Sequence, residues 1–317
     1  MTETFLTSLL VLTILAASAA LARRLVTAPA IVFLVVGIVL AFVPGFPPVE
    51  MAPESVLLMV LPPLIYSAGV SMSWREFKSN LRPIALLAIG CVIFTTCAVA
   101  AATHWLLGLP WGVGFVLGAI VSPPDVVAPL AIAKRLHLPH RILVILEGEG
   151  LANDATALIL YRFAVLAVST GSFSLPTAAG SFVLILFGEM AFGIIVGWLS
   201  LRLRQWAHDA RVEILLSLLT PYLAYWVPEH LGGSGLIATV AAGLYVSWNG
   251  PLLISAATRL QGIFFWDLTI WLIEGVLFLL MGFEVRVLIE KAKAVPIGEV
   301  LVAIALTSAI VIAARFI

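Results

Sequence analysis

Long apolar segments recur along the whole chain and are separated by short polar turns. Eleven of them come near the length, about 20 residues, that an α-helix needs to cross the hydrocarbon core of a bilayer. The predicted helices cover residues 5–22, 28–43, 55–70, 83–107, 111–134, 141–169, 178–203, 212–227, 234–248, 268–285 and 297–317. The basic, amphipathic segment 73–82 is predicted to lie at the membrane interface, and 259–266 is predicted to form an interfacial segment before the tenth helix. The pattern therefore predicts an all-α polytopic membrane protein with about 11 membrane helices.

The composition supports this prediction and limits the number of domains. The 317 residues are 62% hydrophobic and only 11% charged, with a mean hydropathy of +1.15. A soluble domain is nearer half apolar and a quarter charged. No polar stretch is long enough for a second domain, so residues 1–317 are predicted to form a single membrane domain. Both cysteines, Cys91 and Cys97, fall in one apolar segment, which argues against a disulfide framework and a zinc site.

The loop charges predict an orientation. One set of alternate loops carries 12 of the 17 Lys and Arg residues, and the opposite set carries 3. Loops rich in Lys and Arg stay in the cytoplasm. The N-terminus is therefore predicted to lie outside the cell, and the loops around 134–141 and 202–211 inside.

Prolines interrupt the predicted helix 111–134 near its middle. Pro123 and Pro124 each remove a backbone donor and clash with the preceding turn. Backbone groups freed at membrane depth must be buried in protein or line a wet cavity. Asp125 follows directly, and secondary transporters build ion sites from broken helices beside carboxylates. A simple proline kink is the alternative.

Acidic residues also lie inside the predicted helix 141–169. A charge near the bilayer midplane costs on the order of 3 kcal/mol by insertion scales, so these residues call for a function. Glu149 and Asn153 share a helix face, and Asp154 points about 100° further round. Together with Asp125 and opened carbonyls, Asp154 would form an oxygen cage that suits alkali or alkaline-earth cations. No Cys or His lies at this depth, which argues against a transition metal.

The same carboxylate can serve two ions. Burial favours the protonated form of a carboxyl group, whereas a bound cation favours the ionised form. Asp154 is therefore predicted to hold either a proton or a cation, which couples their movements, although a structural ion pair is the alternative. For Glu149 a structural pair with Arg315 is equally plausible. Glu147 and Arg162 are interpreted as structural.

Several longer motifs resemble one known family. They are IVSPPDVVAPLAIAKRL (120–136), ILEGEGLANDATALILYRFAV (145–165), LLTPYLAYWVPEHLGGSGLIATVAAGL (218–244), FLLMGFEV (278–285) and IVIAARF (310–316). They resemble the bacterial sodium/proton antiporters of the cation:proton antiporter family, in its electroneutral branch. The resemblance implies an inverted-repeat antiporter fold with a broken crossing helix. It also implies a core, about 111–170 and 268–317, that moves against a dimerisation scaffold.

The resemblance assigns roles to individual residues. It implies that Asp154 is the shared cation and proton carboxylate and that Asp125 is a second ligand or orients the first. Asn153 would support the broken helix, and Glu149 would pair with Arg315. The predicted ion and proton site comprises Asp154, Asp125, Asn153, Glu149 and Pro124, with Na⁺ held by Asp154 and Asp125.

The chain departs from the family pattern at three places. Pro124 and Val126 stand where the family usually has threonine and proline. Gly150 replaces a frequent serine and removes a possible hydroxyl ligand. The family continues with two helices beyond Ile317, so we expect either a fragment or an incomplete repeat, and transport only from the complete protein.

These observations predict a secondary transporter that exchanges a monovalent cation, foremost Na⁺, for H⁺ by alternating access. The exchange is predicted to be electroneutral, one ion for one proton, without a cofactor or nucleic acid. The predicted location is the cell membrane, as a homodimer in the bilayer. A proton-coupled transporter of another ion is one alternative. An intramembrane aspartyl hydrolase using Asp125 and Asp154 is another, but the Gly-x-Gly-Asp pattern of such proteases is missing.

Overall fold

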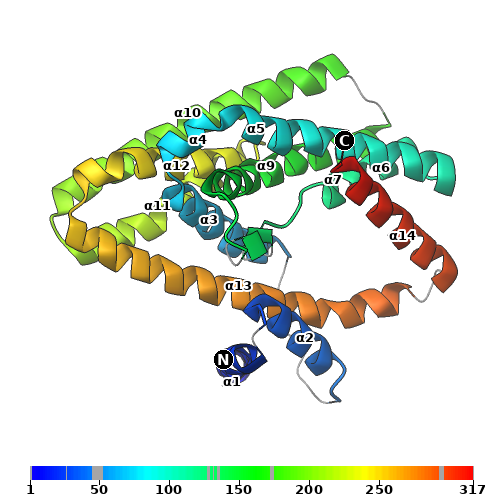
Figure 1. Ribbon diagram of the computed structural model, residues 1–317, viewed down its shortest axis with the longest axis horizontal. Helices are drawn as coiled ribbons and strands as arrows, with labels where there is room; N and C mark the ends of the chain where they lie inside the picture. Colours follow the sequence, from blue (N-terminus) through cyan, green and yellow to red (C-terminus); the bar gives the residue numbers. More distant parts are fainter. Residues whose placement is uncertain are drawn as a thin grey trace. The chain divides into compact units, whose positions relative to one another are not determined.

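The computed structural model is built from helices (Figure 1). It describes residues 2–25, 27–44, 53–126, 129–130, 132–133, 136–171, 175–292 and 296–316, and no strand occurs among them. The helices are α1 (Thr2–Leu25), α2 (Pro29–Ala41), α3 (Pro53–Ser71), α4 (Trp74–Ser79), α5 (Leu81–Ala85), the π-helix η1 (Leu86–Cys91), α6 (Val92–Leu107), α7 (Trp111–Val121), α9 (His140–Thr170), α10 (Leu175–Ala207), α11 (Ala210–His230), α12 (Leu236–Leu253), α13 (Ala256–Ala292) and α14 (Ile297–Ala314).

The predicted all-α polytopic membrane architecture is confirmed. Each apolar window of the sequence contains a helix, and the ends lie within a few residues of the predicted ones except in the windows 111–134 and 268–285. Within the described residues, five continuous helical segments are long and apolar enough to cross a bilayer: Leu81–Leu107, His140–Thr170, Gly180–Ala207, Leu236–Leu253 and Ile297–Ala314. Many large apolar side chains on the outside of these helices are exposed, as expected for a surface that lipid covers.

Two predicted elements differ from the observed ones. Residues 259–266 were expected to form a separate interfacial segment, but they belong to the continuous 37-residue helix α13. No proline interrupts α13, so the backbone hydrogen bonds run on through its polar start. The predicted helix 111–134 stops at Val121 instead, directly before Pro123 and Pro124.

The described chain divides into two compact units. The first comprises Met1–Val60 and Gly262–Val300, and the second Leu61–Gln261 and Leu301–Ile317. In the first unit, α2 packs closely against α13 because glycines meet: a Cβ atom on Gly282 would lie 2.5 Å from the carbonyl oxygen of Leu34. The ring of Phe33 also meets Trp271 edge to face, with centroids 6.3 Å apart.

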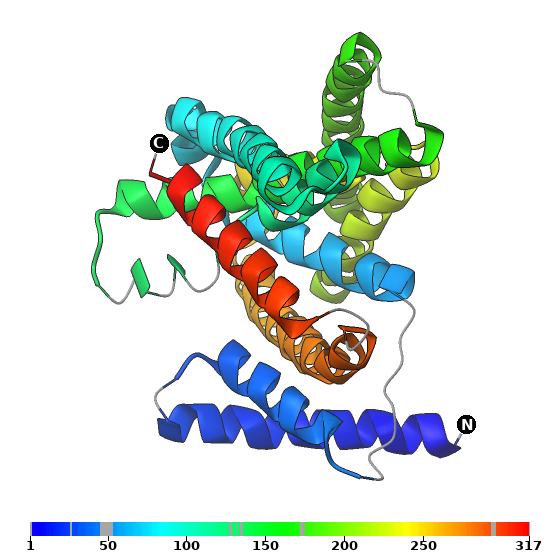
Figure 2. The same ribbon diagram turned by 90° about the vertical axis from the view of Figure 1, so that its right-hand side faces the viewer.

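The second unit contains the helices around the proline break. In it α10 packs along α12, and α7 packs between α6 and α9 (Figure 2). Gly118 of α7 allows a close approach to α6, because a Cβ atom there would lie 2.5 Å from the carbonyl oxygen of Thr96. Small residues at such contacts let helix backbones approach in a membrane, where packing is the main attraction between helices.

An ion pair holds the end of α14 to α9 in the second unit. Arg315 Nη1 donates to Glu149 Oε1 at 2.6 Å, and the Glu149 side chain is only 3% exposed. The structure thus brings together the two residues that the sequence suggested as partners. Arg315 Nη2 is buried and has no hydrogen-bond partner among the described residues. The contact between the Arg315 guanidinium and the Glu149 carboxylate thus links the residue after α14 to α9.

Removing one member of this pair should destabilise the protein. An isolated buried charge costs about 3–5 kcal/mol, so Glu149→Gln and Arg315→Gln should each lower the thermal midpoint in detergent. The double variant should recover part of the loss because neither charge is then left alone. Glu290→Gln is the matched control: it breaks an exposed pair with Arg286, which contributes at most about 1 kcal/mol, and it leaves the hydrogen bond from Arg286 to the Ala41 carbonyl in place. A double variant no more stable than the single variants would contradict the pairing.

Candidate functional site

The second unit contains a break in a membrane helix. After α7 ends at Val121, residues 122–126 are not helical. The cause is local, since Pro123 and Pro124 cannot donate backbone hydrogen bonds and their rings clash with the preceding turn. The rest of the predicted helix 111–134 lies partly outside the described residues. Asp125 is thereby presented from an opened backbone.

The side chain of Asn153 closes one gap that the break creates. Asn153 of α9 is fully buried, and its Nδ2 donates to the carbonyl oxygen of Pro124 at 3.2 Å. An unsatisfied backbone group at membrane depth would cost several kcal/mol. The amide therefore joins α9 to the break. In addition, the backbone N–H of Asp154 donates to Asn153 Oδ1 at 2.7 Å.

The two aspartates that were predicted to bind the cation lie on either side of this contact. Asp125 follows Pro124, and Asp154 follows Asn153, so the hydrogen bond brings both carboxylates to one place. They are close enough for their charges to repel each other. Both residues are exposed within the second unit. Two neighbouring carboxylates of this kind favour the binding of a cation or a proton between them.

Gly150 and Val126, which both depart from the family pattern, lie next to each other. A Cβ atom on Gly150 of α9 would overlap the side chain of Val126 in the break, and one on Gly148 would overlap the side chain of Ile84 in α5. Val126 therefore occupies the space that a serine side chain at position 150 would need. The absence of a side chain at position 150 and the presence of valine at position 126 are therefore sterically linked.

A polar contact that the sequence did not predict lies at the start of the break. The hydroxyl of Thr96 in α6 donates to Ser122 Oγ at 3.2 Å, and Ser122 in turn donates to the carbonyl oxygen of Ala119 at 3.3 Å. Both hydroxyl residues are buried. Their signal in the sequence was a polar residue inside an apolar segment, directly before Pro123. They anchor the end of α7 to α6.

A second group of charged residues in this unit lies around Gly233 and Ser234. Arg162 Nη2 lies 2.6 Å from Glu229 Oε1, and Arg162 Nη1 donates to the carbonyl oxygen of Gly233. Glu189 accepts from the hydroxyl of Ser234 at 3.1 Å. These contacts agree with the structural interpretation of Arg162. Glu229 was missed because it lies beyond the end of the predicted helix 212–227, whereas α11 continues to His230.

Among the described residues, no group of three or more His, Cys, Asp or Glu side chains could hold a metal ion. Glu149 is engaged by Arg315. A cation at Asp125 and Asp154 would take its remaining ligands from backbone carbonyls and water, which suits a weakly held, exchangeable ion.

Comparison with solved structures shows the fold. The structure of the sodium proton antiporter MjNhaP1 from Methanocaldococcus jannaschii at pH 8 matches with a TM-score of 0.65 and 18% identity, over 89% of this chain and 71% of that chain. The electron-microscopy structure of the same antiporter gives a TM-score of 0.72, over 89% and 70% of the two chains.

Comparison with curated sequences gives the family. An uncharacterized Na⁺/H⁺ exchanger of Mycobacterium tuberculosis is 38% identical over 84% of this chain and 48% of its own length. A sodium, potassium, lithium and rubidium/H⁺ antiporter of Bacillus subtilis is 33% identical over 89% of this chain and 44% of its own. The chain thus spans about half the length of these relatives. The sequence model for the sodium/hydrogen exchanger transmembrane region matches residues 9–317, and the chain therefore belongs to the sodium/hydrogen exchanger family.

Proposed function

We propose that the protein is a secondary active transporter that exchanges a monovalent cation for H⁺. The observation that carries this proposal is the hydrogen bond from Asn153 to the Pro124 carbonyl, which brings Asp125 and Asp154 together at a broken membrane helix. Na⁺ is the first candidate cation. Related Na⁺/H⁺ antiporters support it, and the name of the Bacillus subtilis relative adds potassium, lithium and rubidium as candidates.

Asp154 is proposed as the group that binds either the proton or the cation. Its neighbour Asn153 is neutral, so only one carboxylate at this place on α9 can load and unload a proton. Asp125 would act as a second oxygen ligand or orient the first, without changing its own protonation during the cycle. One proton against one monovalent cation leaves the exchange electroneutral.

The exchange is proposed to proceed by alternating access. The proposed core, about 111–170 and 268–317, would carry the ion site past the remaining helices, which would serve as scaffold and dimer contact. Within α9, Glu149 would keep its structural role with Arg315 and would not bind the ion. The protein is proposed to act as a homodimer in the cell membrane, with its N-terminus outside.

The alternatives differ in their support. Proton-coupled transport of another ion uses the same site, and only flux measurements with different ions distinguish it. An aspartyl hydrolase with Asp125 and Asp154 as a dyad loses its support, because the family and the solved relatives are transporters.

Asp154→Asn should abolish exchange in the complete protein, since the amide can neither release a proton nor supply a negative charge to the cation. Proteoliposomes containing a pH-sensitive dye, exposed in turn to Na⁺, Li⁺ and K⁺, would report the flux. Asp209→Asn is the control, because Asp209 caps α11 through backbone N–H groups and asparagine caps equally well. Normal flux in Asp154→Asn would rule out the proposed carrier.

The rate of exchange should be insensitive to an imposed membrane potential. A cycle that moves one positive charge in each direction transfers no net charge, so a potential does no work on it. Valinomycin and a K⁺ gradient would set the potential while Na⁺-driven proton flux is recorded. Faster exchange at an inside-negative potential would show a second titrating group, Asp125 first among the candidates.

Single cysteines should reveal the proposed orientation. In a background without Cys91 and Cys97, His137→Cys and His208→Cys should resist an impermeant thiol reagent in intact cells, since both fall in loops predicted to be cytoplasmic. Gly171→Cys is the matched control on the opposite side and should react. The reverse labelling pattern would overturn the orientation.

A further inference from the structure

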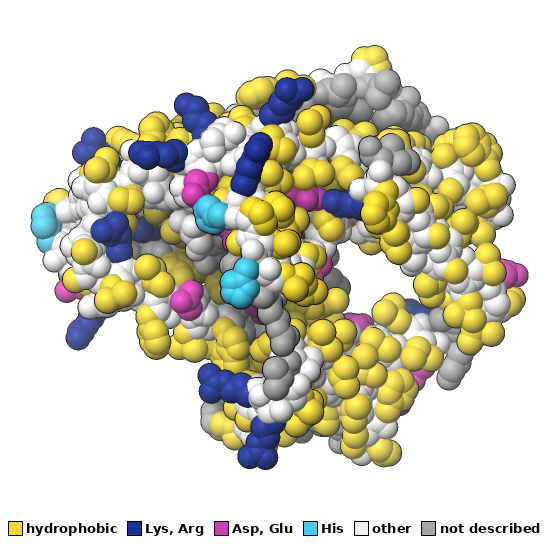
Figure 3. Space-filling view, viewed as in Figure 1, with side chains coloured by type: hydrophobic (Ala, Val, Ile, Leu, Met, Phe, Trp, Pro, Cys, Tyr) yellow, Lys and Arg dark blue, Asp and Glu magenta, His cyan; other side chains and the backbone are white. Residues whose placement is uncertain are grey.

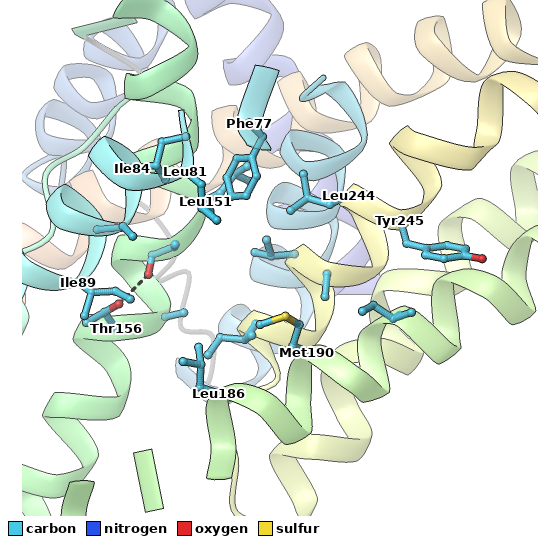
Figure 4. Close-up of a pocket in the computed structure, with 18 of the residues that line it drawn as sticks. Phe77, Leu81, Ile84, Ile89, Leu151, Thr156, Leu186, Met190, Leu244 and Tyr245 are labelled. Carbon is cyan, nitrogen blue, oxygen red and sulfur yellow. Dashed lines mark hydrogen bonds between the residues drawn. The ribbon is translucent and has the colours of Figure 1, made fainter. Parts of the chain in front are cut away.

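A large apolar cavity lies in the second unit, and neither Asp125 nor Asp154 lines it, although Ala155, the residue after Asp154, does. It has a volume of about 450 Å³ and is lined by residues of α4, α5, η1 and α9 on one side and of α10 and α12 on the other (Figure 4). Figure 4 shows Phe77 at one end and Leu186 towards the other. The volume is within the range of small-molecule sites, so the cavity can hold a guest of substantial size.

The chemistry of the wall selects an apolar guest. Most lining side chains are aliphatic or aromatic, with Thr156 and Tyr245 contributing the hydroxyl groups. The hydroxyl of Thr156 already donates to the carbonyl oxygen of Ala152 at 3.0 Å, as the dashed line in Figure 4 shows. Because no charged side chain lines the cavity, a charged or strongly polar guest would lose its hydration without compensation.

One end of the cavity has the features of a membrane–water interface. The Trp74 ring of α4 stacks on Phe77 and on Trp248 of α12, with centroids 6.1 Å and 5.8 Å away. Tryptophan is enriched at the level of lipid headgroups. The short helix α4 also joins two predicted membrane helices, which places it at a membrane surface. The opposite end, near Leu186, then lies deeper in the bilayer.

The helices at this interfacial end carry exposed basic residues. Arg75 and Lys78 of α4 and Arg82 of α5 are exposed, and none of them forms an ion pair with a described residue. The one acidic residue of α4, Glu76, is engaged by His140 at 2.9 Å. Figure 3 shows Lys and Arg side chains over the α4 and α10 region of an otherwise largely apolar face. The cations are therefore available to an anion from the headgroup layer.

We propose that the cavity binds one acyl chain of an anionic phospholipid, whose phosphate is held by Arg75, Lys78 and Arg82. Each methylene of the chain would gain contact with the apolar wall, and the basic residues would select an anionic headgroup. The proposal is independent of the exchange activity. Residues of α9, the helix that carries Asp154, line one wall of the cavity. The bound lipid would therefore stabilise the packing of α9 against α10 and α12.

The test uses the purified complete protein and two lipids with identical chains, phosphatidylglycerol and phosphatidylcholine. In native mass spectrometry, one phosphatidylglycerol should stay bound at concentrations where phosphatidylcholine does not, and it should raise the thermal midpoint. Ala241→Phe places a ring in the cavity and should weaken phosphatidylglycerol binding at least tenfold. Ala191→Phe, at an exposed position on α10 outside the lining, should leave it unchanged.

A second pair of variants tests the headgroup separately and does not depend on the folding of Ala241→Phe. Replacing Lys78 and Arg82 by Gln should reduce the preference for phosphatidylglycerol over phosphatidylcholine by about fivefold per charge, since each basic residue near the surface contributes about 1 kcal/mol. The same change at Arg23 and Arg24 removes equal charge elsewhere and should have no effect. Equal binding of both lipids, equal loss in both double variants, or retention of detergent alone would overturn the proposal.

Discussion

The hydrogen bond between the Asn153 amide and the Pro124 carbonyl is the interaction on which the candidate site depends. Two prolines open the backbone after Val121, and a membrane offers no water to satisfy the exposed carbonyl groups. The buried amide supplies the missing donor at 3.2 Å. The acceptor residue precedes Asp125 in the sequence, and the donor residue precedes Asp154. One hydrogen bond therefore satisfies a backbone carbonyl at the break and also brings the two carboxylates together.

Close packing around this bond decides how the break is accommodated. Gly118 allows α7 to meet α6, and Gly150 leaves room for Val126. The Thr96 hydroxyl donates to Ser122 Oγ at the end of α7. The site is therefore surrounded by backbone contacts and small residues, which are the means by which membrane helices approach closely. A larger side chain at any of these glycines would have to move a neighbouring element.

The charges of the second unit have separate tasks. Glu149 pairs with Arg315, and Glu229 pairs with Arg162, so these carboxylates are neutralised by fixed partners. Asp154 forms no ion pair with any described residue. A carboxylate without a fixed counter-ion can exchange its own partner, whether proton or cation. This difference in pairing separates the proposed carrier from the structural acids nearby.

The sequence by itself determined the helical membrane architecture, the position of the break at Pro123 and Pro124, and which acidic residues lie inside membrane helices. These features follow from local causes: apolar length, missing backbone donors and the cost of charge in lipid. The tertiary structure alone decided the donor to the Pro124 carbonyl, the contact of Gly150 with Val126, the Arg162–Glu229 pair and the cavity beside α4. Each of these joins residues far apart in the chain, and such pairings depend on how helices pack, which periodicity and composition along one helix do not encode.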